Sequence, residues 1–175
     1  RRASRQESPR RASAMVGRSK RKAHAPITLT PLDAKRTETG VEYKYVSLAL
    51  DHAARMATLT VRAPDGKEPE SVEELAKSGA NAWALRAFRE LDDALLELRF
   101  NRPLISVVAV KTTGDHDAVR AVDAFLAKNK EDGLVREVTL HMKRVLKRMD
   151  ITSKSFFSLV EPGSCFVGSL LELAL

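Results

Sequence analysis

Hydrophobic and polar side chains alternate in two neighbouring stretches in the first half of the chain. The alternating apolar positions are Val46, Leu48 and Leu50 in residues 43–50, and Ala57, Leu59 and Val61 in residues 56–61. A repeat of two residues is typical of a β-strand with one buried face. Residues 51–55 between the stretches contain turn formers, and Ala63-Pro64-Asp65-Gly66 ends the second stretch. The pattern therefore predicts a β-hairpin.

Apolar side chains spaced by three and four residues mark the strongest predicted helix, residues 82–100. Its apolar stripe consists of Leu85, Phe88, Leu91, Leu95 and Leu98, and its polar side of Arg86, Arg89, Glu90, Asp93 and Glu97. One side should pack on the core, with Trp83 and Phe88, while the other meets water. Similar patterns predict helices over residues 71–77, 117–128 and 134–149. The last has a basic side, which is either solvated or faces phosphates or an acidic partner.

Two apolar runs have the composition of buried strands. Residues 104–110 form an apolar, β-branched run, which is typical of a strand covered on both faces. A second run begins at Phe156 and is followed by a turn at Pro162-Gly163 and a helix-favouring run. The order is therefore hairpin, helix, strand, two helices, strand and helix. This alternation predicts an α/β fold with a right-handed crossover between the two later strands.

Residues 156–175 carry the candidate chemistry. A strand, a glycine-bearing turn and a helix, in that order, present backbone N–H groups at the helix start. Such a helix start binds anions and stabilises negative charge that develops on a substrate oxygen. The same residues include one carboxylate after the turn, Glu172, and one thiol, Cys165. A helix start nearby would lower the pKa of Cys165 and favour a nucleophile; an inert thiol is the alternative.

Positive charge is concentrated near the N-terminus. The chain has 30 Lys and Arg residues against 23 Asp and Glu residues, a formal net charge of +7. Residues 1–22 hold nine of these basic residues and one acid, Glu7, so the remainder is close to neutral. A folded domain of that kind lacks the basic surface of a nucleic-acid-binding protein.

Residues 1–26 are expected to be a disordered tail or linker, and residues 27–175 a single domain. The tail is rich in Arg, Ser and Ala, and it buries too little apolar surface to offset its chain entropy. Alternatives are a transit peptide or a tail phosphorylated at Ser4 or Ser13. Because the chain starts at Arg1 and stops inside a predicted helix, we expect it to be part of a longer polypeptide.

Cysteine, histidine and hydropathy patterns argue against three further classes of protein. One cysteine cannot form an intramolecular disulfide, which fits a reducing compartment and a cytoplasmic location. The four histidines lack metal-ligand spacing, so no metal site is expected. No stretch of about 18 apolar residues is free of charge, so no membrane span is expected.

Two segments resemble the crotonase, or enoyl-CoA hydratase, superfamily. They are residues 104–115, a strand leading to Thr113-Gly114-Asp115, and residues 156–175, a strand leading to Glu172-Leu173-Ala174. Shorter stretches resemble, more narrowly, superfamily lyases that open the ring of an aromatic acyl-CoA. These stretches are residues 79–83, 89–94, 113–115 and 159–166. The resemblance covers about residues 27–175 and implies an incomplete crotonase-like domain of the ββα spiral type, from the front of the second of two such halves.

The resemblance also implies a site for thioester chemistry. Crotonase-like enzymes hold a thioester carbonyl between two backbone N–H groups that stabilise an enolate oxyanion, and a carboxylate acts as general acid or base. The matching oxyanion or substrate-binding positions are Gly168 and Ser169, with Gly114 in the earlier turn. Glu172 matches the catalytic carboxylate, and Glu161 is a second catalytic candidate. The chain has one glycine where the superfamily has three.

Each candidate carboxylate has a structural alternative. Glu172 could serve on the helix face or as a cap, and Glu161 could stabilise the positive end of a helix that starts near Ser164. The resemblance implies a lyase that takes an acyl-CoA substrate, needs no separate cofactor, and forms homo-oligomers when intact. The alternative function is a non-catalytic crotonase-like half that serves structure or assembly. We expect residues 1–175 by themselves to be inactive.

Overall fold

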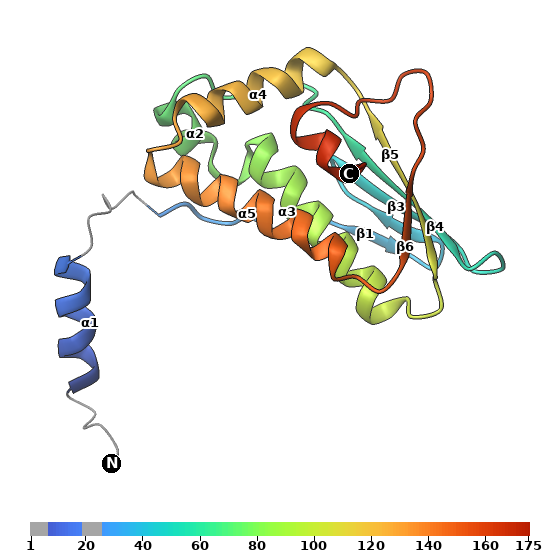
Figure 1. The fold of residues 1–175 in the computed structure, drawn as a ribbon, viewed down its shortest axis with the longest axis horizontal. Helices are drawn as coiled ribbons and strands as arrows, with labels where there is room; N and C mark the ends of the chain where they lie inside the picture. The colour runs from blue at the N-terminus through green and yellow to red at the C-terminus, as the bar shows by residue number, and fades with distance from the viewer. Residues whose placement is uncertain (1–6, 19–25) are drawn as a thin grey trace.

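The structure is a computed structural model that describes residues 7–18 and 26–175 (Figure 1). Residues 26–175 form an α/β body built on a six-stranded sheet of order β1-β2-β3-β4-β5-β6, which confirms the predicted class. Strand pairs are antiparallel from β1 to β4 and parallel from β4 to β6. The strands are β1 Lys35–Thr37, β2 Gly40–Glu42, β3 Val46–Asp51, β4 Met56–Arg62, β5 Val107–Thr113 and β6 Ser155–Ser158.

The predicted hairpin is confirmed as β3 and β4. Val46 lies opposite Val61, and Leu48 lies opposite Leu59, with all four side chains buried in the core. The pattern did not predict β1 and β2, which extend the sheet beyond β3. All three residues of β1 are exposed, so no alternation of apolar side chains marks that strand.

The predicted helices are also present, close to their expected bounds. The described helices are α1 Glu7–Arg18, α2 Val72–Ser78, α3 Trp83–Leu96, α4 His116–Lys128 and α5 Gly133–Asp150. Two short 3₁₀ turns are η1 Gly79–Asn81 and η3 Gly168–Leu173, and η2 Glu97–Asn101 is a π-helical turn that continues α3. Side chains cap α4 and α5 at their starts: Asp115 accepts the Asp117 N–H at 2.8 Å, and Asp132 accepts the Leu134 N–H at 2.8 Å.

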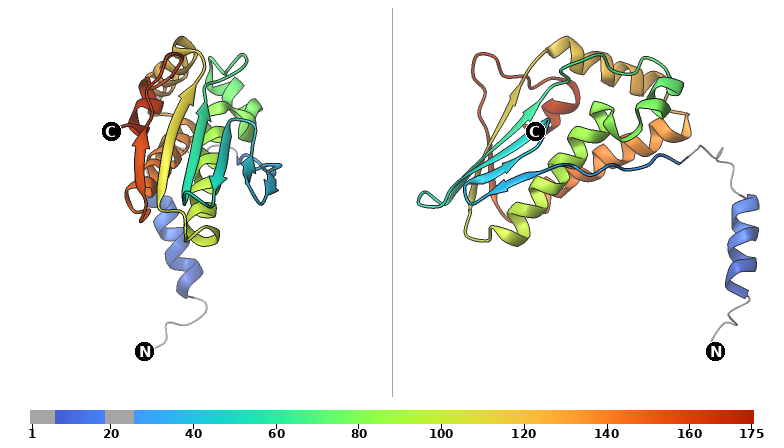
Figure 2. Two further views of the ribbon diagram at one scale, coloured as in Figure 1. Left: turned by 90° about the vertical axis from the view of Figure 1, so that its right-hand side faces the viewer. Right: turned by 180° about the vertical axis from the view of Figure 1, so that it is seen from behind.

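Helix α3 lies at the centre of the body. It packs against β3 and β4 on one side and against α5 on another (Figures 1 and 2). Trp83 and Phe88 are 0% and 1% exposed, which confirms their predicted place in the core. Their rings meet edge to face with centroids 6.1 Å apart, an arrangement that aromatic pairs favour.

A buried ion pair lies on the side of α3 that was predicted to face water. Glu90 is 0% exposed, and its carboxylate accepts hydrogen bonds from Arg86 at 2.6 Å and from the Tyr45 N–H at 2.7 Å. Arg86 also donates to the carbonyls of Pro31 and Leu32, at 3.1 and 2.7 Å. Burial of both charges is tolerated because each has several partners. The polar side of α3 therefore joins two other segments of the body.

Disorder was predicted over residues 1–26, and the part of this segment at residues 7–18 is helical. Residues 7–18 form α1, whose side chains from Pro9 to Arg18 are exposed. Its Ala and Arg residues are good helix formers, which favours a helix over these positions. Ser4 lies outside the described residues, as do the rest of residues 1–6 and residues 19–25.

The two later strands also differ in detail from their predictions. β5 starts at Val107 rather than at residue 104, because Leu104 is 72% exposed and only residues from Val107 pair with β4. β6 is parallel to β5, as expected, but it is not a fully buried strand. It is the last strand of the sheet, and Phe157 is 58% exposed there. Among the described residues, no helix combines the length and hydropathy that a membrane span requires.

Candidate functional site

The predicted helix start near the end of the chain is the 3₁₀ turn η3. Leu170 and Leu173, three residues apart, are both buried, and they fix one side of η3 to the body. At its start the Ser169 N–H donates a hydrogen bond of 2.7 Å to the carboxylate of Asp123, on α4. The N–H group that was predicted to bind a substrate oxygen is therefore already bound to an oxygen of the same chain.

Gly168 allows this contact by its lack of a side chain. Its φ is +50°, in the left-handed region that glycine adopts most readily. A Cβ at this position would lie 2.0 Å from Oδ2 of Asp123, far inside contact distance. Gly168 is thus required by the close approach of a carboxylate, which is the type of contact that the resemblance assigns to a substrate.

Asp123 is half-buried, and two opposing effects act on the pKa of its carboxyl group. Burial raises the pKa of this carboxyl above its usual range, while the hydrogen bond from the Ser169 N–H acts in the opposite direction. A backbone N–H that stabilises a carboxylate is also suited to an oxyanion. In this structure the donor at the turn serves an anion of the same chain.

Glu172 lies close to this contact but does not take part in it. Its side chain is exposed, and within the described residues it has no hydrogen bond or ion pair. Gly168, Ser169, Asp123 and Glu172 line one cavity of about 400 Å³ between α4 and α5. The cavity also has two ammonium groups on its wall, from Lys130 and Lys143. The structure thus brings three of the five predicted site residues together.

Glu161 belongs to a different environment from Glu172. Its carboxylate forms an ion pair with Lys111 of β5, and its N–H donates to the Ser164 hydroxyl at 2.9 Å. No helix starts at Ser164, because η3 begins only at Gly168. The expected contact between Glu161 and a helix start is therefore wrong, and a surface ion pair takes its place.

Gly114 serves the packing of a turn. Its φ is +120°, and a Cβ there would lie 2.6 Å from the Cβ of Ala63. The neighbouring Thr113 carbonyl accepts the Ala63 N–H at 2.8 Å, so the turn is held against the end of β4. Gly114 is not among the residues that line the cavity at Glu172. Its predicted role in substrate binding has no support from this position.

Cys165 is an inert thiol by its environment. The residue is fully buried, and its N–H donates to both the carbonyl and the hydroxyl of Thr112, at 3.1 and 3.0 Å. Burial raises the pKa of the thiol, and the nearby charge of Asp115 adds to the effect. The expectation of a lowered pKa is wrong because the residue lies in the core ahead of η3. No group of metal-binding side chains was found in the described parts of the chain.

Comparison with known proteins gives one informative relative. No family model matches the chain. Over 166 residues, or 94% of its length, the chain is 40% identical to benzoyl-CoA-dihydrodiol lyase from Aromatoleum evansii. The chain spans 30% of the length of that protein. The resemblance to a lyase of this kind is thereby confirmed, whereas the match to the front of its second half stays a prediction.

Proposed function

We propose that this chain is part of a lyase that acts on an aromatic acyl-CoA, the dihydrodiol of benzoyl-CoA. The observation that supports this proposal is the 40% identity to benzoyl-CoA-dihydrodiol lyase over 94% of the chain. The CoA thioester is part of the substrate, so no separate cofactor is needed. In this proposal, N–H groups stabilise negative charge on the thioester oxygen, and carboxylates move protons at the ring carbons.

A second proposal concerns the share of this chain in the reaction. The Ser169 N–H donates to the Asp123 carboxylate at 2.7 Å, so this donor is already occupied by a residue of α4. This contact favours the role of a supporting half, in which η3 joins α4 to the body and the oxyanion is bound elsewhere. Glu172 and Asp123 could instead act as an acid–base pair, because both line one cavity. The engaged N–H favours the supporting role.

Turnover of benzoyl-CoA dihydrodiol by the product of the complete gene tests both proposals. Absence of ring opening in the wild-type product would overturn the first. For the second, Glu172→Gln should leave kcat within about threefold of wild type, because a general acid or base contributes about 10²–10⁴-fold. A loss of about a hundredfold with intact folding would assign Glu172 to the chemistry. Glu131→Gln, an exposed acid in the α4–α5 connection, is the matched control.

Homo-oligomer formation, the absence of a nucleic-acid partner and a cytoplasmic location stay predictions from the sequence. Lys143, an exposed lysine of α5 at the cavity, fits the idea that the basic side of this helix meets phosphates. We propose that the phosphates of CoA make that contact. A Lys143→Met variant should then raise KM for the acyl-CoA while leaving kcat unchanged.

A further inference from the structure

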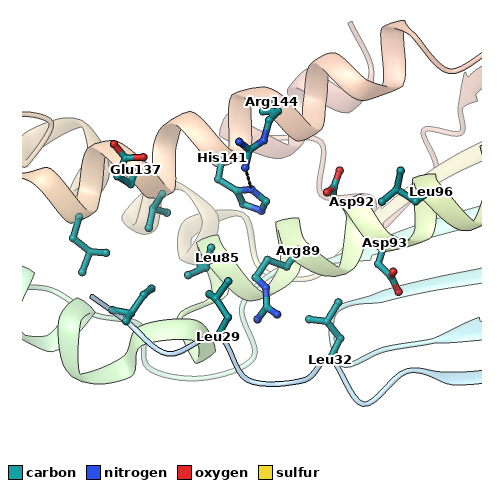
Figure 3. Close-up of a pocket in the computed structure, with 13 residues that line it drawn as sticks. Leu29, Leu32, Leu85, Arg89, Asp92, Asp93, Leu96, Glu137, His141 and Arg144 are labelled. Atoms are coloured by element: carbon teal, nitrogen blue, oxygen red, sulfur yellow. Dashed lines mark hydrogen bonds between the residues drawn. The ribbon is translucent and has the colours of Figure 1, made fainter. Parts of the chain in front are cut away.

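A second cavity lies on the far side of α5 from η3, between α3, α5 and the segment that precedes β1. Its volume is about 430 Å³, within the range of small-molecule sites. Most of its wall is apolar, with Leu29 and Leu32 from the N-terminal segment and Leu85 and Leu96 from α3. Figure 3 shows Arg89 extending from α3 towards the N-terminal segment, and His141 extending from α5 towards α3.

Arg89 carries a buried donor without an acceptor. Its Nη2 donates to the Thr30 carbonyl at 2.9 Å. Its Nη1 is buried and, in the part of the chain that is described, has no hydrogen-bond partner. The neighbouring acid on α3, Glu90, is already paired with Arg86. A guanidinium remains charged at neutral pH and has only donor groups, so it calls for an oxygen acceptor.

His141 provides a second buried donor on the opposite wall. Its Nδ1 lies 3.1 Å from Nη2 of Arg144, as Figure 3 shows with a dashed line. Because a guanidinium can only donate, Nδ1 must be the acceptor, and the proton of the neutral ring is therefore on Nε2. Burial and the charge of Arg144 lower the pKa of His141, which keeps the ring neutral. Nε2 is buried and has no partner among the described residues.

The acids on the wall do not supply the missing acceptor. The Asp92 carboxylate is bound by Arg148. The Asp93 carboxylate is bound by Arg36 at 2.6 Å and by the Tyr43 hydroxyl at 2.7 Å. Glu137, the third acid, also has an interaction partner. A buried donor without a partner is destabilising, so two such donors at one cavity favour a bound acceptor.

We propose that this cavity binds a small carboxylate, whose oxygens accept hydrogen bonds from Arg89 Nη1 and His141 Nε2. The apolar body of the ligand contacts the leucines of the two facing segments. A carboxylate suits the site better than a neutral acceptor because Arg89 has no anionic partner of its own among the described residues. The apolar wall excludes a strongly hydrated inorganic anion as the best ligand, because such an ion would lose water without gaining contacts.

The test is a titration of the full chain with sodium benzoate, followed by calorimetry and by ¹⁵N NMR of the histidine rings. Saturable binding with a shift of the His141 Nε2 resonance is expected. Acetate, which lacks the apolar body, and benzamide, which lacks the charge, should each bind at least tenfold more weakly. No saturable binding of benzoate would overturn the proposal and leave water as the occupant.

Substitutions at the two donor residues test whether benzoate binds in this cavity. Arg89→Met keeps an unbranched apolar stem but removes the guanidinium, and it should weaken benzoate binding at least tenfold, while Arg136→Met, on the exposed side of α5, should not change it. His141→Phe keeps a ring but removes the donor, and it tests the site independently if Arg89→Met does not fold. Unchanged affinity in either folded variant would contradict the proposal. Binding is measured without turnover, so its failure would leave the proposed lyase function untouched.

Discussion

The contact between η3 and α4 makes a quantitative prediction for a double-mutant cycle. Gly168 and Asp123 each affect the same hydrogen bond, the one that joins the Ser169 N–H to the Asp123 carboxylate at 2.7 Å. Asp123→Ala removes the acceptor. Gly168→Ala places a Cβ 2.0 Å from Oδ2, so the carboxylate must move away and the same bond is lost. The two substitutions should therefore not be additive.

The magnitudes follow from the two physical effects. A hydrogen bond to a charged group contributes about 1.5–3 kcal/mol, which is the expected loss for Asp123→Ala. Alanine in the left-handed region, where Gly168 lies at φ +50°, adds about 1–2 kcal/mol of backbone strain. Gly168→Ala should thus cost about 2.5–5 kcal/mol. The double variant loses the bond once, so it should be about 1.5–3 kcal/mol more stable than the sum of the single effects predicts.

The assay is equilibrium unfolding of the full chain in urea. Fluorescence of Trp83, the single tryptophan of the sequence, and far-UV circular dichroism must give the same transition before free energies of unfolding are compared. Gly163→Ala is the matched control, because its φ of +88° is also left-handed but its Cβ would meet no atom within 4 Å. It should cost about 1–2 kcal/mol and add to Asp123→Ala. If Gly168→Ala and Asp123→Ala add within about 0.5 kcal/mol, the reasoning is refuted.

Two further predictions test burial at named groups. Glu90→Ala should lower the free energy of unfolding by about 3–5 kcal/mol, because it removes the buried carboxylate that lies 2.6 Å from the Arg86 guanidinium. Asp117→Ala, which breaks an exposed pair with Arg120, should cost less than about 1 kcal/mol. Equal costs in urea unfolding would show that the ion pair at Glu90 is not effectively buried. Cys165 should react with a thiol reagent at least tenfold more slowly in the folded chain than in urea, and equal rates would contradict its place in the core.

The parts of the fold that sequence reasoning predicts are those in which local pattern and tertiary environment agree. In β3 and β4, the alternating residues Val46, Leu48 and Leu59 all face the core. In α3, Leu91 and Leu95 follow the helical repeat and are buried in the core. Burial of one face is enough to determine element type and register in these segments. The pattern is therefore informative wherever one face is apolar and the other is polar.

The polar side of α3 shows where this reasoning ends. Arg86 and Glu90 have the spacing of a surface ion pair, and the binary pattern assigns them to water. In the structure, the backbone of Tyr45 and the carbonyls of Pro31 and Leu32 surround them. These partners lie more than 40 positions away in the chain. No local pattern in the sequence indicates such long-range partners. Burial of a charged residue on a predicted polar face can therefore be recognised only once the fold is known.

Asp123 is the site residue that the sequence did not indicate. It lies in a predicted helix and looks like an ordinary polar position, and its partner Ser169 is 46 residues away. Gly168 is the residue in the sequence that points to such a contact, because a left-handed φ and a close contact both favour glycine there. That clue indicates that something approaches the turn closely. It does not distinguish an internal carboxylate from a bound substrate.

The difference between those two occupants has an energetic consequence for catalysis. A thioester oxygen can bind to the Ser169 N–H only if the Asp123 carboxylate leaves it, since an N–H at 2.7 Å from one oxygen has no room for another of similar strength. Displacing the carboxylate costs about 1.5–3 kcal/mol, which would weaken an acyl-CoA complex at this position by about 10- to 150-fold. A site that must stabilise a developing oxyanion gains most when its donors are free and already oriented. The Ser169 N–H at the start of η3 therefore serves the contact with α4, and a substrate oxygen would have to displace Asp123 to use it.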